Sequence, residues 1–208
     1  GHGPYVQCRD LFENLSLEIE KGEFVGLVGK SGAGKTTLLN IIGLITDISE
    51  GTITIDGHQN LSMNGKNAMI LRRYTIGYLF QNYGLIEDES VLWNLKLALE
   101  YKKIKREEKL KLINKYLKQF ELSDMLNKKV YQLSGGEQQR IAIIKLILQG
   151  SQIILADEPT SGLDKENELI VMKLLKELNE KGITIIMVTH NMNLCDCFSR
   201  VINVENFR

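Results

Sequence analysis

Hydrophobic and polar positions along this chain predict short strands that alternate with amphipathic helices. Short apolar runs bounded by glycine or charged residues are typical of strands, and they occur at residues 11–19, 24–28, 51–57, 74–80, 153–156 and 183–188. Apolar residues that recur at helical spacing predict helices at residues 37–42, within 91–120, and at about 137–148 and 165–181. In the second half of the chain this alternation indicates a parallel sheet joined by crossover helices.

Two segments depart from the parallel pattern. Residues 51–57 alternate regularly between two glycines, which predicts a half-exposed antiparallel strand. Residues 82–133 carry helical spacing, and we expect Trp93 to be buried among them. The residues expected on the apolar face of this segment are Leu110, Ile113, Leu117 and Phe120. The prediction is a single domain over 1–208, with an α/β core and antiparallel β part at 1–81 and 134–208 and a helical subdomain at 82–133.

Composition and charge narrow the classes of function. The 208 residues suffice for one domain with a sizeable core. Lysine and arginine total 26, as do aspartate and glutamate, so no net basic field indicates a nucleic-acid partner. No apolar run approaches the roughly 20 residues that span a bilayer. We therefore expect any link to a membrane to come through a partner.

The three cysteines do not form a metal motif. Cys8, Cys195 and Cys197 lack the second pair or histidine cluster of a zinc site, which favours reduced thiols in a cytoplasmic protein. The opening Gly1-His2-Gly3 does not resemble a native start or a secretory signal, and we expect native residues to be missing before it.

The strongest local motif is the glycine-rich loop that joins the strand at 24–28 to the next helix. Its glycines permit a tight turn that brings backbone N–H groups to a phosphate, and the helix points its positive end at the same anion. Lys35 would reach the β- and γ-phosphates, and the Thr36 hydroxyl would ligate Mg²⁺. A glycine-rich turn without a ligand is the less favoured alternative. The residues expected at the nucleotide are Gly29, Lys30, Ser31, Gly32, Ala33, Gly34, Lys35, Thr36 and Thr37.

Two carboxylates end the buried strand at 153–156. Asp157 and Glu158 stand at its carboxyl end, where ligands of open α/β sheets collect. Asp157 would hold Mg²⁺, directly or through water, and Glu158 would polarise the water that attacks the γ-phosphate. Taken alone, an acidic pair that merely ends a strand explains them equally well, but the phosphate loop favours the catalytic interpretation.

A second potential phosphate site follows at residues 133–137. Ser134, Gly135, Gly136 and Glu137 open a helix, which makes an anion cradle that a nucleotide on the first loop does not require. A head-to-tail dimer accounts for both, because each nucleotide would lie between one copy's loop at 29–36 and the other copy's turn at 134–136. The alternative is a simple helix cap.

Together these motifs resemble the ATP-binding cassette (ABC) ATPases over nearly the whole chain. The loop at 29–36, Gln81, the turn at 133–137, the strand and acidic pair at 153–158, the segment 161–164 and His190 occur in the family's order. The resemblance implies a P-loop NTPase (RecA-like) α/β fold and an ATPase that uses ATP and Mg²⁺. It also implies a homodimer of nucleotide-binding domains, peripheral on the inner face of the membrane beside a separate permease.

The same resemblance assigns roles to individual residues. It implies that Gln81 senses the metal and the attacking water, that His190 holds the γ-phosphate and that Asp164 communicates across the dimer. It implies that Ser134 and Gly136 contact the partner's ATP.

Three positions depart from the family. Tyr5 lies near the place of the adenine-stacking aromatic residue although the strand that usually precedes it is not visible, Asn191 replaces a common acid, and Lys145 replaces a common arginine.

The segment after Gln81 is similar to the macrolide-exporter, lipoprotein-release and cell-division cassettes, and looks closest to bacteriocin-export ATPase subunits. In such systems this surface receives a permease helix, so Tyr83, Leu85 and Ile86 are candidates for that groove, with ordinary packing as the alternative. Peptide, bacteriocin or drug export is the function expected. The alternatives are a cassette that drives a membrane protein in cell-wall regulation without transport, and a soluble cassette acting on nucleic acid or ribosomes. An ordinary P-loop kinase would leave the turn at 133–137 unexplained.

Overall fold

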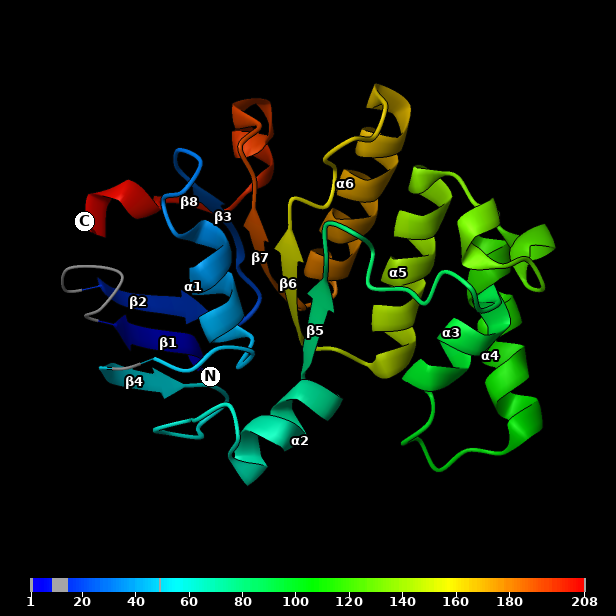
Figure 1. The fold of residues 1–208 in the computed structure, drawn as a ribbon, viewed down its shortest axis with the longest axis horizontal. Coiled ribbons are helices and arrows are strands. Elements are labelled where there is room, and N and C mark those ends of the chain that lie inside the picture. The colour runs from blue at the N-terminus through cyan, green and yellow to red at the C-terminus, as the bar shows by residue number, and fades with distance from the viewer. Residues whose placement is uncertain (1, 9–14, 49, 208) are drawn as a thin grey trace.

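A computed structural model describes residues 2–8, 15–48 and 50–207, and shows two sheets with flanking helices (Figure 1). The strands are β1 (His2–Cys8), β2 (Leu15–Glu20), β3 (Phe24–Val28), β4 (Gly51–Thr54), β5 (Ile76–Leu79), β6 (Ile153–Asp157), β7 (Thr184–Val188) and β8 (Arg200–Asn203). The α-helices are α1 (Lys35–Ile42), α2 (Lys66–Tyr74), α3 (Val91–Ala98), α4 (Arg106–Gln119), α5 (Gly135–Gln149) and α6 (Lys165–Glu180). Short 3₁₀ segments lie at Ser123–Met125, Val130–Gln132, Met192–Cys197 and Val204–Phe207.

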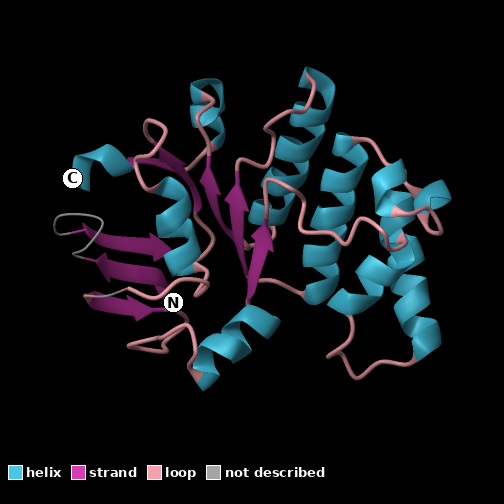
Figure 2. Cartoon of the chain, in the orientation of Figure 1, coloured by secondary structure: helices cyan, strands magenta, loops and turns pink. Residues whose placement is uncertain are grey.

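The larger sheet is parallel, as the alternation of strands and helices predicts. Its strand order is β5-β6-β7-β3-β8, and every neighbouring pair in it is parallel. A second, antiparallel sheet has the order β2-β1-β4, which confirms the antiparallel strand expected from residues 51–57 (Figure 2). The strand expected at 74–80 is shorter, because Tyr74 is the last residue of α2.

Two hydrophobic cores lie on opposite faces of the parallel sheet. In β6, Ile154 and Ala156 belong to the core shared with α5 and α6, whereas Ile153 and Leu155 belong to the core around α1. Successive side chains of a strand point to opposite faces, so a strand covered on both sides is apolar throughout. Helix α1 lies between the parallel and the antiparallel sheet (Figure 1). The first turn of α1, which begins at Lys35, is thereby held at the edge of the parallel sheet.

The helical segment packs on α5 through α3 and α4, and two expectations about it are wrong. Trp93 is 40% exposed, because α3 directs Val91, Asn94 and Leu95 inward and leaves the tryptophan on its outer side. Leu110 is likewise 40% exposed. The other residues expected on that face are buried, namely Ile113, Leu117 and Phe120.

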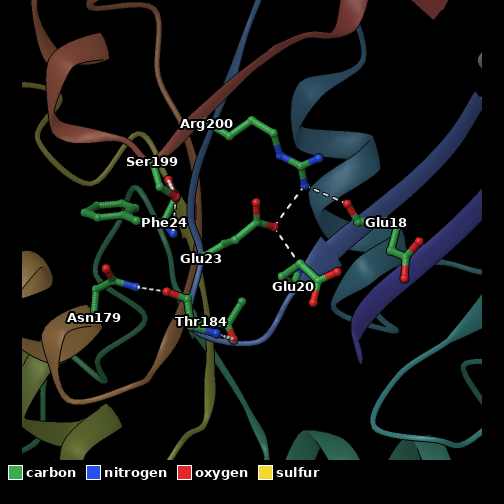
Figure 3. A network of polar contacts seen from close by, with 9 residues as sticks. Glu18, Glu20, Glu23, Phe24, Asn179, Thr184, Ser199 and Arg200 are labelled. Atoms are coloured by element: carbon green, nitrogen blue, oxygen red, sulfur yellow. Dashed lines mark hydrogen bonds and ion pairs between the residues drawn. The ribbon is translucent and has the colours of Figure 1, made fainter. Parts of the chain in front are cut away.

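A polar network ties the turn between β2 and β3 to the last strands of the sheet (Figure 3). Arg200 donates to a Glu23 carboxylate oxygen at 2.9 Å and to the carbonyl of Glu18 at 2.6 Å. Beside it, the Ser199 hydroxyl accepts from the N–H of Phe24 at 2.9 Å and donates to the Phe24 carbonyl at 3.0 Å. These contacts fix the start of β3, the strand that leads into the glycine-rich loop.

We expect Ser199→Ala to lower the free energy of unfolding by about 1 kcal/mol. The substitution removes the acceptor for the N–H of Phe24, a residue that is 2% exposed. Urea unfolding at constant pH measures the change, and Ser199→Thr serves as the control because it keeps the hydroxyl. If the alanine and threonine variants lost the same stability, the loss would not come from this hydrogen bond.

Candidate functional site

The glycine-rich loop leaves β3 and turns directly into α1. Gly29, Gly32 and Gly34 have φ angles of 145°, 77° and 91°, a region that only glycine adopts without strain. Gly34 is the N-cap of α1 and has no side chain to occupy the helix end. The first N–H groups of an α-helix have no partner within the helix, so a helix end with no capping side chain is suited to binding phosphate.

Lys35 and Thr36 direct their polar atoms into this site. Lys35 is 8% exposed, and its Nζ donates to the carbonyls of Gly29 at 2.7 Å and Lys30 at 2.8 Å. The Thr36 hydroxyl donates to an Asp157 carboxylate oxygen at 3.2 Å. An ammonium group inside the loop and a hydroxyl paired with a carboxylate are suited to a phosphate with its counter-ion.

The carboxyl ends of β3, β6 and β7 bring the other polar groups to the same edge of the sheet. Glu158 follows β6 with a φ of 47°, and one of its carboxylate oxygens lies 2.8 Å from Nδ1 of His190, which follows β7. A cavity of about 370 Å³ lies between them and the loop. Its lining consists of Ser31, Gly32, Ala33, Gly34, Lys35, Thr36, Thr37, Glu158, Val188 and His190.

Burial raises the pKa of Asp157 above its usual value of 3.8, an effect that the nearby Glu158 carboxylate reinforces and that the Thr36 hydroxyl and Lys35 partly offset. A native pKa above the unfolded value means that the charged form destabilises the fold at neutral pH. A cation bound beside Asp157 would remove this penalty.

We therefore expect Asp157→Asn to stabilise the nucleotide-free protein at pH 7 by about 0.5 kcal/mol, a small gain because water screens the exposed part of the carboxylate. The penalty develops as the pH rises above the unfolded pKa, so the gain should shrink as the pH falls toward 3.8. Urea unfolding of both proteins at several pH values measures it. A gain that is independent of pH would contradict the electrostatic cause.

The turn before α5 is where the second phosphate cradle is expected. Ser134 is the N-cap: its hydroxyl accepts from the Glu137 N–H at 3.3 Å, and the Glu137 carboxylate accepts from the Ser134 N–H at 2.7 Å. A Cβ on Gly135 would lie 2.7 Å from the Tyr83 hydroxyl, and a Cβ on Gly136 would lie 2.0 Å from Asn167 Oδ1. The turn is thus a helix cap, as one interpretation expects, and its glycines also allow neighbouring side chains to approach the backbone closely.

Comparison with known proteins decides the family. Residues 12–161 match the family described as ABC transporter. The chain belongs to this family. It is 40% identical over 196 residues to the macrolide export ATP-binding/permease protein MacB of Campylobacter jejuni, covering 94% of this chain and 31% of that protein. It is 41% identical to an uncharacterized ABC transporter ATP-binding protein of Methanocaldococcus jannaschii, covering 93% of this chain and 87% of that protein.

Solved ABC cassettes share the fold. The cassette MJ0796, in a dimeric post-hydrolysis state bound to ADP and Pi, superposes with a TM-score of 0.84 at 38% identity and covers 97% of this chain and 90% of its own. Another dimeric structure of that cassette has a TM-score of 0.86 at 36% identity, over 96% of this chain and 93% of its own. The P-loop NTPase α/β fold is confirmed, and so is the prediction that the chain is an ABC ATPase.

Not every residue that the ABC resemblance singles out lies at the cavity. The described residues that line the cavity do not include Gln81, Asp164 or the turn at 134–137. Gln81 is exposed two residues after β5, at the same edge of the sheet as Asp157. Tyr5 lies within β1, so a strand is present where none was expected, but its side chain is outside the described residues.

Asn167 is a partner of Asp164 that the sequence analysis did not identify. Asp164 is the N-cap of α6, and its carboxylate accepts from the backbone N–H of Asn167 at 2.8 Å and from the Asn167 side chain at 3.0 Å. These bonds lower the pKa of Asp164. The sequence signal for this contact is an asparagine that follows three residues after an aspartate at the start of a helix.

The candidates for the permease groove have different environments. Tyr83 lines a cavity of about 250 Å³ together with Tyr78, Phe80 and Lys145. Leu85 is buried and packs in the core, as the alternative interpretation expects, whereas Ile86 is 50% exposed. Within the described ranges, no helix has the length and apolar character needed to cross a bilayer.

Proposed function

We propose that this chain is a single nucleotide-binding domain that pairs head to tail with a second copy around two ATP molecules and drives a separate membrane permease. The observation that carries the proposal is the presence of two helix ends suited to phosphate in one chain, at Gly34 and at Ser134. The second helix end is not part of the cavity at the first. A head-to-tail pair places each ATP between two different cradles.

Within one site, the loop at 29–36 holds the phosphates, His190 contacts the γ-phosphate and Glu158 accepts a proton from the attacking water. The oxygen atoms of Thr36 and Asp157 are 3.2 Å apart and are ligands of the kind that Mg²⁺ prefers, and Gln81 supplies a further oxygen. When bound, Mg²⁺ neutralises charge on the phosphates.

From the second copy, Ser134, Gly135, Gly136 and Glu137 contact the same ATP, and Asp164 communicates between the two sites. ATP favours the closed dimer because each γ-phosphate touches both copies, and hydrolysis removes that bridge. The cycle of closing and opening is the movement that a membrane partner converts into transport.

The permease is a separate protein in this proposal. The MacB relative carries ATP-binding and permease functions in one protein, and this chain spans 31% of its length. The cavity lined by Tyr83 receives a helix of the permease. Residues 82–133 act as a helical subdomain that moves with this permease helix. The protein then lies on the inner face of the cell membrane, and its cargo is a drug or a peptide such as a bacteriocin.

Substitution at the second cradle tests the dimer. In a Glu158→Gln background, Ser134→Arg should abolish the ATP-dependent dimer while ATP binding to the monomer is unchanged, because the arginine obstructs only the partner's nucleotide. Ser90→Arg is the matched control, since Ser90 also caps a helix, accepting from the Trp93 N–H at 3.1 Å. Light scattering with and without ATP distinguishes monomer from dimer. Dimerisation of the Ser134→Arg protein would contradict the arrangement.

A further inference from the structure

The loop that carries His190 is fastened to α6 by a buried carboxylate. Asn191 donates from its side-chain amide to Glu168 Oε2 at 3.1 Å, and Lys165 donates to the other oxygen of Glu168. Glu168 is only 9% exposed although it lies on a surface helix. Both of its oxygens are therefore occupied, one by a residue of its own helix and one by the loop after β7.

Asn191 is held through both its backbone and its side chain. Besides the bond to Glu168, its backbone N–H donates to the Thr189 hydroxyl at 3.0 Å, and its side-chain oxygen accepts from the Asn193 N–H at 3.1 Å. Thr189 is 1% exposed. His190 stands between these two anchored residues, so their positions determine where its ring lies relative to Glu158.

We infer that Glu168 is a positioning residue for His190, because it fixes from a neighbouring helix the loop that carries this histidine. An amide at position 191 suits this contact, because a second carboxylate placed at hydrogen-bond distance from Glu168 would repel it. Glu168, Asn191 and His190 all line one hollow of about 560 Å³ beside the nucleotide cavity. The inference rests on the proposed role of His190.

An ordinary surface ion pair does not account for this geometry. A Lys165–Glu168 pair within one helix stabilises the helix only weakly and requires no burial of the carboxylate. Here the carboxylate is turned inward, and its second oxygen contacts a loop 23 residues away in sequence. The backbone N–H of Glu168 donates to the Asp164 carbonyl at 2.9 Å, so the same turn of α6 connects Asp164 with the His190 loop.

A double-mutant cycle on purified full chain tests this role. Asn191→Asp replaces the amide donor by a second carboxylate, and we expect it to lower kcat about ten- to a hundredfold with KM for ATP unchanged, because it displaces the His190 loop. Adding Glu168→Gln supplies an amide donor to the new carboxylate and should restore kcat to within about twofold of the original. Glu168→Gln alone keeps only one acceptor oxygen for two donors and should lower kcat less than Asn191→Asp does.

The readouts separate positioning from folding and from the proposed function. The inference would be overturned if Asn191→Asp kept the wild-type kcat. It would also be overturned if adding Glu168→Gln did not restore kcat, or if the fall in kcat were accompanied by loss of ATP binding. His190→Ala is the independent control. If His190→Ala abolishes turnover, the role of His190 stands whatever the cycle shows, whereas unchanged turnover in His190→Ala would overturn that role and this inference with it.

Discussion

We expect Glu158→Gln to lower ATP turnover about a thousandfold while ATP remains bound, which is the effect of removing a general base. Glutamine keeps the size of the side chain and a partner for His190 Nδ1, 2.8 Å from the carboxylate in this structure, but it cannot accept a proton at neutral pH. The loop at 29–36 is unchanged, so nucleotide affinity should not fall. Phosphate release under saturating Mg²⁺ and ATP measures the turnover.

The same variant should accumulate as an ATP-bound dimer, because the step that separates the two copies no longer occurs. Glu166→Gln, on the exposed start of α6, is the control and should behave as the wild type. Retention of more than about a tenth of wild-type turnover in Glu158→Gln would show that another group activates the water.

The second large effect concerns Lys35→Ala, for which we expect ATP affinity to fall about a hundredfold. Hydrogen bonds to charged groups contribute about 1.5–3 kcal/mol, and Lys35 is the ammonium group buried in the loop, 2.7 Å from the Gly29 carbonyl. The loss is in binding itself, so it differs from that of Glu158→Gln, which leaves ATP bound. Titration with a fluorescent ATP analogue measures the dissociation constant.

Lys30→Ala provides a control from the same loop. The Lys30 side chain is 88% exposed and pairs only loosely with Glu205, at 3.8 Å, so its removal should change the affinity less than threefold. Equal losses of affinity in the Lys30 and Lys35 variants would indicate that general positive charge, and not a directed contact, binds the phosphates.

Strands β3, β5, β6 and β7 of the parallel sheet could be predicted because they are largely buried on both faces and so are continuous apolar runs. Other elements lack such a signal. Helix α2 buries only Ala68 and Leu71, and the four residues of β8 are exposed or half-buried, so neither has a clear apolar pattern. Strand β1 is defined by its pairing with β2 and β4, which are distant in sequence from one another.

The parts of the site that are contiguous in sequence were also predictable. The loop at 29–36 and the pair Asp157 and Glu158 each combine a strand end with the residue types that phosphate chemistry requires. The hydrogen bond between Glu168 and Asn191 was not predictable, because it joins an ordinary surface-helix acid to an ordinary loop amide. Trp93 was misplaced because apolar character alone does not say on which side of a short helix a residue lies.

The division of the interior into two cores makes the helical segment interchangeable in principle. Every buried apolar residue between 82 and 133 belongs to the core shared with α5 and α6, and none to the core that surrounds α1. Replacing this segment therefore alters packing on one face of the sheet while the support beneath the phosphate loop stays intact. The surface formed by the helical segment and the phosphate loop can thus change independently of each other.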